Sequence, residues 1–356
     1  MTECGVHTLS EILSQPLTWQ DALEAYRLRK SSIKALWQRQ PIEQVIFTGC
    51  GSTHYLSMTA AALFQSLTGI PSQARPASEL IFFPDLVFAP KRQFMLVAIS
   101  RSGETTETIE AVQVFRNQTD GHIIAITCYG DSQLANKADV ALIATAAHEK
   151  SIAQTRSFTS MVVLSEALAG HLAGHSKQQT LDQLPALGER LLTRYQSLAQ
   201  EIGEDKTLER YFFLGSGHLY GIASEAMLKM KEMSLSYSEA YHPLEFRHGP
   251  MSMVNEQTLV VGLLSDEGLK HEIAVLEQMQ NLGARILIIS ESDDLPLSIR
   301  RVNTIHLKSV LPEWVRTVLY LPILQLMAYH RAMSRDLNPD KPTHLDAVVR
   351  LESFER

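Results

Sequence analysis

The chain has 356 residues, enough for two domains of ordinary size, and its 45% hydrophobic and 20% charged composition is typical of globular proteins. A formal net charge of -7 gives no general attraction to nucleic acid or an anionic membrane, so a phosphate would need a local site. Three cysteines without close spacing argue against structural zinc, and we expect neither a leader nor a membrane span. We therefore expect a soluble cytoplasmic protein without a metal or other cofactor.

The chain begins with helical periodicity and continues as alternating strands and helices. Residues 8–39 predict one or two helices, with Pro16 ahead of a start at Thr18. A short apolar run then ends in Gly49-Cys50-Gly51, which is typical of a strand, a glycine-rich turn and a helix. Further β-branched runs alternate with helical segments such as 105–116, which is the pattern of βαβ units. Such units form a parallel sheet with helices on both faces.

The same succession of strands occurs a second time. Four apolar runs recur at nearly constant offset, and the matched pairs are 45–51 with 211–217, 97–103 with 261–268, 122–127 with 285–290, and 140–145 with 304–308. Helical patterns at 158–174 and 183–203 lie between the copies, and the charged stretch from Glu204 marks a boundary. We predict a helical segment over 1–40, α/β domains over 41–203 and 204–337, and an extended tail over 338–356.

Hydroxyl side chains gather where one strand of the first copy should end. Residues 100–105 supply serines, a threonine and a glycine at a predicted helix start, a combination that suits a phosphate. A well-capped helix is an equally good interpretation of the spacing alone. Ser52 and Thr53, after the neighbouring strand, could reach the same anion. The equivalent turn of the second copy, 265–268, carries two acids that would repel phosphate, so we expect one phosphate site per chain.

A second group of ionisable residues lies in the second copy. The helix predicted over 222–234 carries Glu225, Lys229 and Glu232 at i, i+4 and i+7, which places them on one face. A surface salt-bridge stripe is the alternative, but flanking methionines and leucines favour charges that line a pocket. The stretch 238–250 predicts an irregular loop in which His248 precedes a rigid Gly-Pro turn.

Together these motifs resemble the sugar isomerase (SIS) family. The chain is similar, from about Val45 to Glu352, to the isomerase half of glutamine:fructose-6-phosphate aminotransferase and to stand-alone amino-sugar-phosphate deaminases and ketose/aldose phosphate isomerases. The matching strings are specific for the family and much less specific for the substrate. The resemblance implies two tandem SIS domains of flavodoxin-like fold, a tail that closes the site, and a homodimer with an active site shared between subunits.

The resemblance also implies a role for each matching residue. Glu232 would move a proton between C1 and C2, with Lys229 as its partner, Glu225 on the same helix face, and His248 opening the sugar ring. The phosphate would be bound by Ser52, Thr53, Ser100, the backbone of Arg101, Ser102 and Thr105. The sugar would be lined by Ile152, Ala153, Gln154 and Ala347.

Three departures from the aminotransferase refine this expectation. We expect no glutaminase domain, because the first predicted strand begins within about fifty residues of the start. Ala347 stands where the aminotransferase has a lysine that handles the open-chain sugar, so Schiff-base chemistry from that position is not expected. Gln154 stands where it has a serine, which is closer to the stand-alone members and favours degradation over synthesis.

The expected function is an enzyme of carbohydrate metabolism. We predict a glucosamine- or galactosamine-6-phosphate deaminase/isomerase that needs no metal or nucleotide and binds neither nucleic acid nor membrane. Alternatives are a phosphosugar isomerase or a fructosamine-phosphate deglycase, which would release no ammonia from hexosamines. A non-catalytic sugar-phosphate sensor is less favoured, because the residues before Val45 are too few and too weakly basic for a DNA-binding domain.

Overall fold

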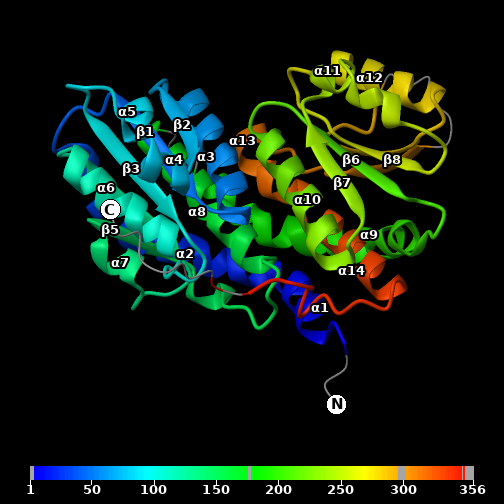
Figure 1. Ribbon diagram of the computed structural model, residues 1–356, viewed down its shortest axis with the longest axis horizontal. Coiled ribbons are helices and arrows are strands. Elements are labelled where there is room, and N and C mark those ends of the chain that lie inside the picture. The colour runs from blue at the N-terminus through cyan, green and yellow to red at the C-terminus, as the bar shows by residue number, and fades with distance from the viewer. Residues whose placement is uncertain (1–3, 175–177, 296–301, 347, 349–356) are drawn as a thin grey trace. The chain divides into compact units, whose positions relative to one another are not determined.

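The computed structural model describes residues 4–174, 178–295, 302–346 and 348. The chain forms two compact units and passes between them more than once (Figure 1). The N-terminal unit comprises Ser14–Glu149, Arg156–Pro185 and Asp346–Arg356, and the C-terminal unit comprises Met1–Leu13, Lys150–Thr155 and Ala186–Leu345. The chain therefore begins in the unit that also contains most of its C-terminal half.

The N-terminal unit is built on a parallel sheet. Its described strands lie in the order β2-β1-β3-β4-β5. The central strands β1 and β3 are buried along their whole length, because helices cover both faces of the sheet. Their bounds are β1 Gln44–Gly49, β2 Ser72–Pro76, β3 Phe94–Ile99, β4 His122–Thr127 and β5 Val140–Ile143.

Alternate residues of each strand pack against helices on opposite faces. Leu96 and Ile123 join a core with α4 (Ala77–Phe82), α5 (Pro84–Val87), α6 (Thr106–Gln118) and α7 (Gln133–Lys137). On the other face Phe47 contacts Phe64 of α3, with ring centroids 5.7 Å apart. That face is covered by α2 (Gln15–Trp37), α3 (Ser52–Thr68) and α8 (Arg156–Leu172).

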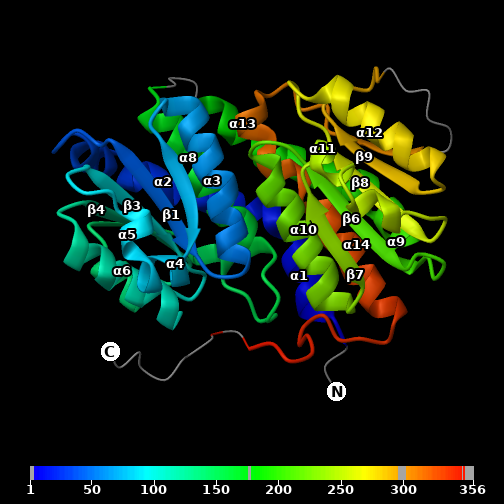
Figure 2. The same ribbon diagram turned by 45° about the horizontal axis from the view of Figure 1, so that its top comes forward.

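The C-terminal unit repeats this architecture. Its described strands are all parallel and lie in the order β10-β9-β8-β6-β7 (Figure 2). Phe212 and Val260 pack against α11 (Pro243–Phe246) and α12 (Leu269–Asn281), whereas α10 (Leu219–Ser234) covers the other face together with α14 (Pro322–Ser334). The remaining bounds are β6 Arg210–Gly215, β7 Tyr237–Tyr241, β8 Thr258–Leu263, β9 Arg285–Ser290, β10 Val302–His306, α9 Leu184–Glu204 and α13 Glu313–Arg316.

The predicted duplication is confirmed, because the two sheets have the same topology: β6, β7, β8, β9 and β10 take the places of β1, β2, β3, β4 and β5. Each sheet contains one more strand than the repeat predicted. The additional strands are the edge strands β2 and β7, and β7 occupies residues that we expected to begin an irregular loop. Helix α9, whose residues were predicted to close the first domain, groups with the C-terminal unit.

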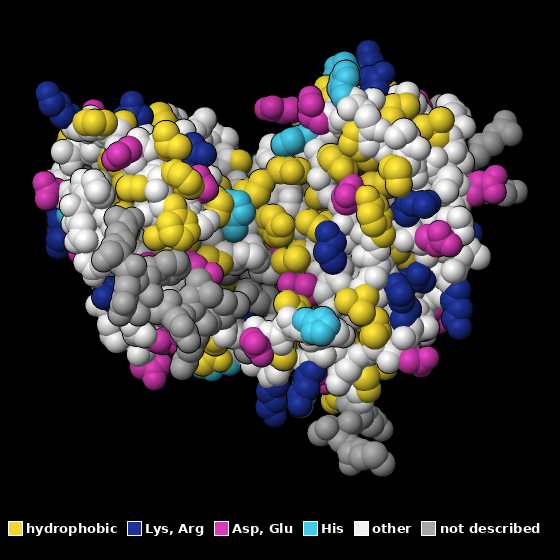
Figure 3. Space-filling model, viewed as in Figure 1, with side chains coloured by type: hydrophobic (Ala, Val, Ile, Leu, Met, Phe, Trp, Pro, Cys, Tyr) yellow, Lys and Arg dark blue, Asp and Glu magenta, His cyan; other side chains and the backbone are white. Residues whose placement is uncertain are grey.

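The N-terminal residues form two helices that belong to different units. Helix α1 (Val6–Leu13) packs against α14, whereas α2 packs against α8. None of the described helices is long and apolar enough to cross a membrane. Figure 3 shows lysine and arginine side chains scattered among acidic and hydrophobic ones on the face that it presents. Any phosphate recognition on that face therefore depends on local geometry.

Candidate active site

The predicted phosphate loop follows β3 in the N-terminal unit. Strands β1 and β3 are neighbours. The chain passes from β1 to β2 on one side of β1 and then crosses over to β3 on the other side, so the strand order reverses between β1 and β3. In open parallel sheets, ligands bind at the carboxyl ends of two such strands, where the strand order reverses. The loop at Ser100 and the turn at Ser52 follow these two strands, so the fold places both of them at the expected position.

Hydrogen bonds within the loop hold its hydroxyl groups in place. The Ser100 Oγ lies 3.1 Å from the Thr105 Oγ1 and accepts a hydrogen bond from the Gly103 amide at 3.1 Å. The Glu104 amide donates to Ser102 Oγ, also at 3.1 Å. Thr105 is the N-cap of α6, so the first N–H groups of that helix lie beside these hydroxyls. The loop thus combines ordered hydroxyls with a helix N-terminus, which suits an anion.

Gly103 is required by the shape of the loop. Its φ of +66° is a left-handed conformation that residues with a side chain rarely adopt. A Cβ at this position would lie 2.1 Å from the Ser132 Oγ, which itself caps α7. The backbone of the loop can therefore pack against Ser132 only because residue 103 is glycine.

The turn after β1 is also tightly hydrogen-bonded. Thr53 Oγ1 donates to the Cys50 carbonyl at 2.9 Å and accepts from the Cys50 amide at 3.0 Å, and both Ser52 and Thr53 are buried. Burial raises the pKa of the Cys50 thiol to about 11, although a contact with Thr108 opposes that shift. The thiol therefore stays protonated at neutral pH, in keeping with its interpretation as a small turn residue.

The side chain of Arg101 points into a buried polar network. It pairs with Glu149 at 3.2 Å, and Glu149 accepts hydrogen bonds from the Ser157 amide at 3.1 Å and from the Ser157 hydroxyl at 2.5 Å. This arrangement is compatible with the expected role of the Arg101 backbone, since the guanidinium is engaged elsewhere. Glu149 lies 48 positions from Arg101, so no local sequence pattern indicates this pair.

The corresponding loop of the second sheet is filled by the protein itself. Glu272, in the first turn of α12, accepts hydrogen bonds from the Ser265 amide at 2.7 Å and the Ser265 hydroxyl at 2.8 Å. Asp266, expected to repel a phosphate, instead pairs with the buried Arg316. An internal carboxylate therefore occupies the place that an anion would take. The reason to expect no phosphate at this loop is thus that Glu272 fills the position, and not simply that acids would repel the anion.

Three charged residues lie along α10 in the C-terminal unit. The Lys229 ammonium lies 3.3 Å from Glu225 Oε1 and 2.5 Å from Glu232 Oε2. Lys229 and Glu225 have 1% and 0% of their side chains exposed, whereas Glu232 has 18% exposed. Burial would lower the pKa of Lys229, but the two carboxylates outweigh it and the pKa is raised. The triad therefore presents one accessible carboxylate beside a permanently charged lysine.

His248 lies in an exposed turn beyond β7 and α11. The following Gly249 has a φ of +126°, so the Gly-Pro turn depends on glycine at this position. Neighbouring His242 is different, because its ring stacks on Tyr220 with centroids 3.9 Å apart. Both histidines are exposed.

The predicted sugar-lining segment belongs to the same unit as α10. Ile152, Ala153 and Gln154 lie in the short stretch Lys150–Thr155, which returns to the C-terminal unit between two segments of the other unit. Ala153 is buried, while Ile152 and Gln154 are partly exposed. Ala347, the fourth predicted sugar-lining residue, lies outside the described residues.

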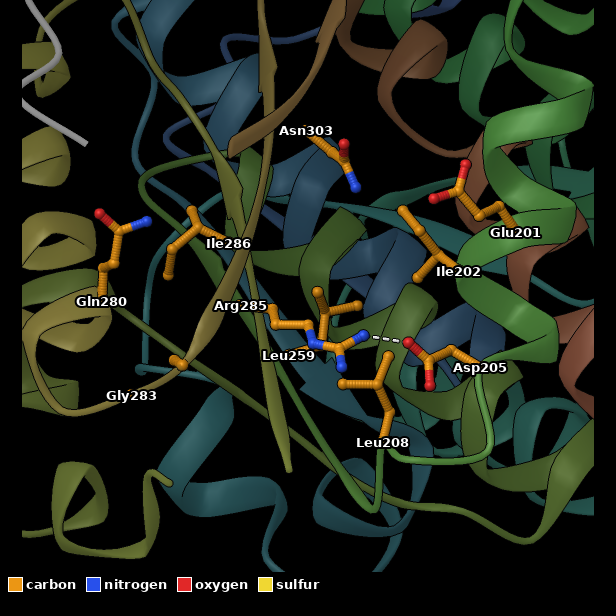
Figure 4. A pocket seen from close by; sticks show the side chains of 11 residues that line it. Glu201, Ile202, Asp205, Leu208, Leu259, Gln280, Gly283, Arg285, Ile286 and Asn303 are labelled. Atoms are coloured by element: carbon orange, nitrogen blue, oxygen red, sulfur yellow. Dashed lines mark hydrogen bonds and ion pairs between the residues drawn. The ribbon is translucent and has the colours of Figure 1, made fainter. Parts of the chain in front are cut away.

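A cavity of about 570 Å³ lies away from these residues, where β8, β9 and β10 begin (Figure 4). Arg285 and Asp205 form an ion pair at this cavity, and none of the predicted site residues lines it. Within residues 4–174, 178–295 and 302–346, no three His, Cys, Asp or Glu side chains are grouped so that they could hold a metal.

Two full-length relatives are glutamine–fructose-6-phosphate aminotransferases. The chain is 26% identical to that of Methanothermobacter thermautotrophicus over 97% of its own length and 57% of the relative's. It is 28% identical to that of Pectobacterium atrosepticum over 96% of its length and 58% of the relative's. The chain thus spans less than two thirds of these proteins.

Solved structures match over nearly the whole chain. A glucosamine-6-phosphate deaminase from Thermotoga maritima is 28% identical with a TM-score of 0.78, covering 97% of this chain and 100% of that one. A tagatose-6-phosphate ketose/aldose isomerase from Escherichia coli has a TM-score of 0.85 over 99% and 98% of the two chains, and at 23% identity it shows the shared fold alone. The SIS domain matches at residues 40–170 and 207–334, one copy for each sheet, and the chain therefore belongs to the SIS domain family.

Proposed function

We propose that the chain is a phosphosugar isomerase-type enzyme that acts on an amino-sugar 6-phosphate and releases ammonia. The observation that carries this proposal is the triad on α10. A carboxylate with 18% of its side chain exposed lies 2.5 Å from a lysine that a second, buried carboxylate holds in place. A surface stripe of charges would not bury a lysine and a glutamate in this way. Such an accessible carboxylate is suited to moving a proton on a bound sugar.

The phosphate is proposed to bind at the loop after β3. Ser100, Ser102 and Thr105 supply hydroxyl donors, and Arg101 contributes its backbone. Ser52 and Thr53 lie after the adjacent strand β1 and belong to the same proposed site. The N-terminus of α6 favours negative charge at this edge of the sheet. Phosphate binding would restrict the orientation of the sugar and so lower the entropic cost of the reaction.

The proposed reaction is a proton transfer followed by hydrolysis of an imine. His248 would open the ring by moving a proton between O1 and the ring oxygen. Glu232 would take the C2 proton of the open-chain aldehyde, giving an enolamine, and after exchange with solvent the Glu232 carboxyl would deliver a proton to C1. The resulting C2 imine adds one water and expels one ammonia, which leaves a ketose 6-phosphate. Lys229, kept protonated, would stabilise negative charge on the neighbouring hydroxyl oxygen.

Several finer expectations belong to this proposal. Glu225 has no exposed side-chain surface, so we assign it the task of holding and neutralising Lys229. The exposed position of His248 is compatible with a homodimer in which each subunit supplies this residue to the other's site. A cytoplasmic location, a closing tail and the predicted domain boundaries remain part of the same proposal. The deaminase of Thermotoga maritima, 28% identical over 97% of this chain, supports the choice of an amino sugar.

The test is an assay with defined sugar phosphates. Purified protein is incubated with glucosamine 6-phosphate, galactosamine 6-phosphate or fructose 6-phosphate, and ammonia and ketose phosphate are both quantified. We expect stoichiometric ammonia and ketose 6-phosphate from one hexosamine phosphate, with deuterium at C1 when the solvent is D₂O. Glu232→Gln should abolish turnover, whereas Glu189→Gln, an exposed substitution on α9, should not.

Other results would select the alternatives. Aldose–ketose interconversion without ammonia would indicate a plain phosphosugar isomerase, and ammonia-free cleavage of a fructosamine phosphate would indicate a deglycase. Tight binding of a sugar phosphate without any turnover would support the alternative of a non-catalytic sugar-phosphate sensor. Unchanged turnover in Glu232→Gln would show that the acid–base assignment is wrong.

A further inference from the structure

Three segments that are far apart in the sequence meet in one buried polar cluster of the C-terminal unit. The segments are helix α1, residues 150–152 and residues 339–340. We call this group the Asp340 cluster, and its members are Thr8, Glu11, Ser151 and Asp340, with exposed fractions of 0%, 3%, 2% and 7%. Polar groups buried to this degree are held by hydrogen bonds, and these bonds fix the segments that carry them.

The first set of contacts joins the chain near its end to the first helix. Asp340 Oδ1 accepts from the Thr8 amide and from the Thr8 hydroxyl, both at 2.7 Å, and Oδ2 accepts from the His7 amide at 3.3 Å. These amides belong to the first turn of α1, whose N–H groups lack partners within the helix. A carboxylate at this position also interacts favourably with the helix dipole. Asp340 is thereby held against α1.

The second set of contacts fixes the predicted sugar-lining segment. Glu11 accepts from the Lys150 amide at 2.6 Å and from the Ser151 amide at 3.3 Å. The Asp340 carbonyl accepts from the Ile152 amide at 3.0 Å, and the Thr8 hydroxyl lies 2.9 Å from the Ser151 hydroxyl. Residues 151–153 form bends and belong to neither helix nor strand. Their backbone course is therefore set by α1 and by residue 340.

We propose that Asp340, Thr8 and Glu11 are positioning residues that fix the backbone of residues 150–154 and thereby set the affinity for the sugar. This inference rests on the proposed function, because it takes Ile152, Ala153 and Gln154 to line the substrate. The three residues are too deeply buried to contact a substrate themselves. They act through the amides of residues 150–152, which anchor the segment immediately before Ala153 and Gln154.

The experiment combines hydrogen exchange of the full-length protein with kinetics on glucosamine 6-phosphate. The variants are Asp340→Asn and Thr8→Val, which remove the charge and the hydroxyl with little change in shape. Thr8→Ser keeps the hydroxyl and serves as the conservative rescue. Asp336→Asn is the matched control, because Asp336 is exposed and has a φ of +56° that asparagine tolerates well.

We expect amide exchange within residues 150–155 to accelerate about tenfold or more in Asp340→Asn and Thr8→Val, since charged hydrogen bonds are lost or weakened. The KM for glucosamine 6-phosphate should rise about tenfold while kcat stays within about threefold, because ground-state contacts are misplaced. Thr8→Ser and Asp336→Asn should retain wild-type values. If Asp340→Asn fails to fold, comparing Thr8→Val with Thr8→Ser in exchange and KM still tests the proposal.

Two results with the variants would overturn the proposal, and a third with the wild-type protein would remove its basis. Unchanged exchange in residues 150–155 would show that the cluster does not fix the segment. Faster exchange with an unchanged KM would show a purely structural role. A wild-type protein that neither binds nor turns over glucosamine 6-phosphate would refute the proposed function and with it the role in sugar affinity, while the exchange data would still decide whether Asp340 holds the segment.

Discussion

Glu225 and Glu232 flank the same lysine, yet their neutralisation should have opposite consequences. Glu225 is fully buried 3.3 Å from the ammonium, which corresponds to about 5 kcal/mol of attraction at an effective dielectric constant near 20. Removing one partner of a buried ion pair costs about 3–5 kcal/mol. Glu225→Gln should therefore lower the free energy of unfolding by about that amount. Glu232→Gln should cost only about 1–2 kcal/mol, because Glu232 is partly exposed and Lys229 keeps Glu225.

Activity should follow the reverse order. Glu232→Gln removes the proposed base and should lower kcat by about 10²–10⁴-fold. Glu225→Gln should retain measurable turnover wherever the protein stays folded. Guanidinium unfolding at pH 7 measures the free energies of unfolding. If the loss in Glu225→Gln comes from an unpaired buried charge, the double variant Glu225→Gln/Lys229→Met should regain stability. A larger stability loss in Glu232→Gln than in Glu225→Gln would refute this reasoning.

Three further predictions concern other parts of the molecule. Burial, with a contribution from Arg316, lowers the pKa of His218 from 6.5 to about 4, so the unfolded state binds its proton first as the pH falls. This residue should lower the free energy of unfolding by about 3 kcal/mol between pH 6.5 and 4. Urea unfolding at several pH values measures that dependence, and His218→Gln should make it shallower. An unchanged pH dependence in His218→Gln would contradict the prediction. Gly103→Ala should lower the free energy of unfolding by about 1–3 kcal/mol, because residue 103 has a positive φ and Ser132 lies close to it. The variant should also gain less thermal stability from glucosamine 6-phosphate than the wild type does. An equal gain in both proteins would contradict this prediction. Glu272→Gln should lower the free energy of unfolding by about 1–3 kcal/mol, because Ser265 loses a charged acceptor. An unchanged free energy of unfolding in chemical denaturation would show that Glu272 does not stabilise this loop.

The central strands were predictable from the sequence and the edge strands were not. Strands such as β1 and β3 are buried on both faces and read as continuous apolar runs, which the duplication made easier to recognise. The edge strands β2 and β7 have the sequences SQARP and YSEAY, and most of their residues are only partly buried. A single polar strand of five residues has no periodic signal that separates it from a loop.

The candidate site was predictable as residue types and not as contacts. The spacing of Glu225, Lys229 and Glu232 placed them on one helix face, and the structure adds that the first two are buried and the third is not. The pair formed by Arg101 and Glu149 joins residues 48 positions apart, so no local pattern indicates it. Long-range pairs of this kind depend on the complete fold, which a single sequence does not supply.

The hydrogen bond between Thr8 and Asp340 has a consequence for the order in which the protein folds during synthesis. It joins residues 332 positions apart. At about 5–20 residues per second, a ribosome needs on the order of 20–60 s to make the intervening chain. Helix α1 emerges long before Asp340 and must wait for this partner until the residues between them have been made. The N-terminal unit, by contrast, can complete its sheet from residues already released. Native placement of α1 therefore follows the synthesis of residue 340.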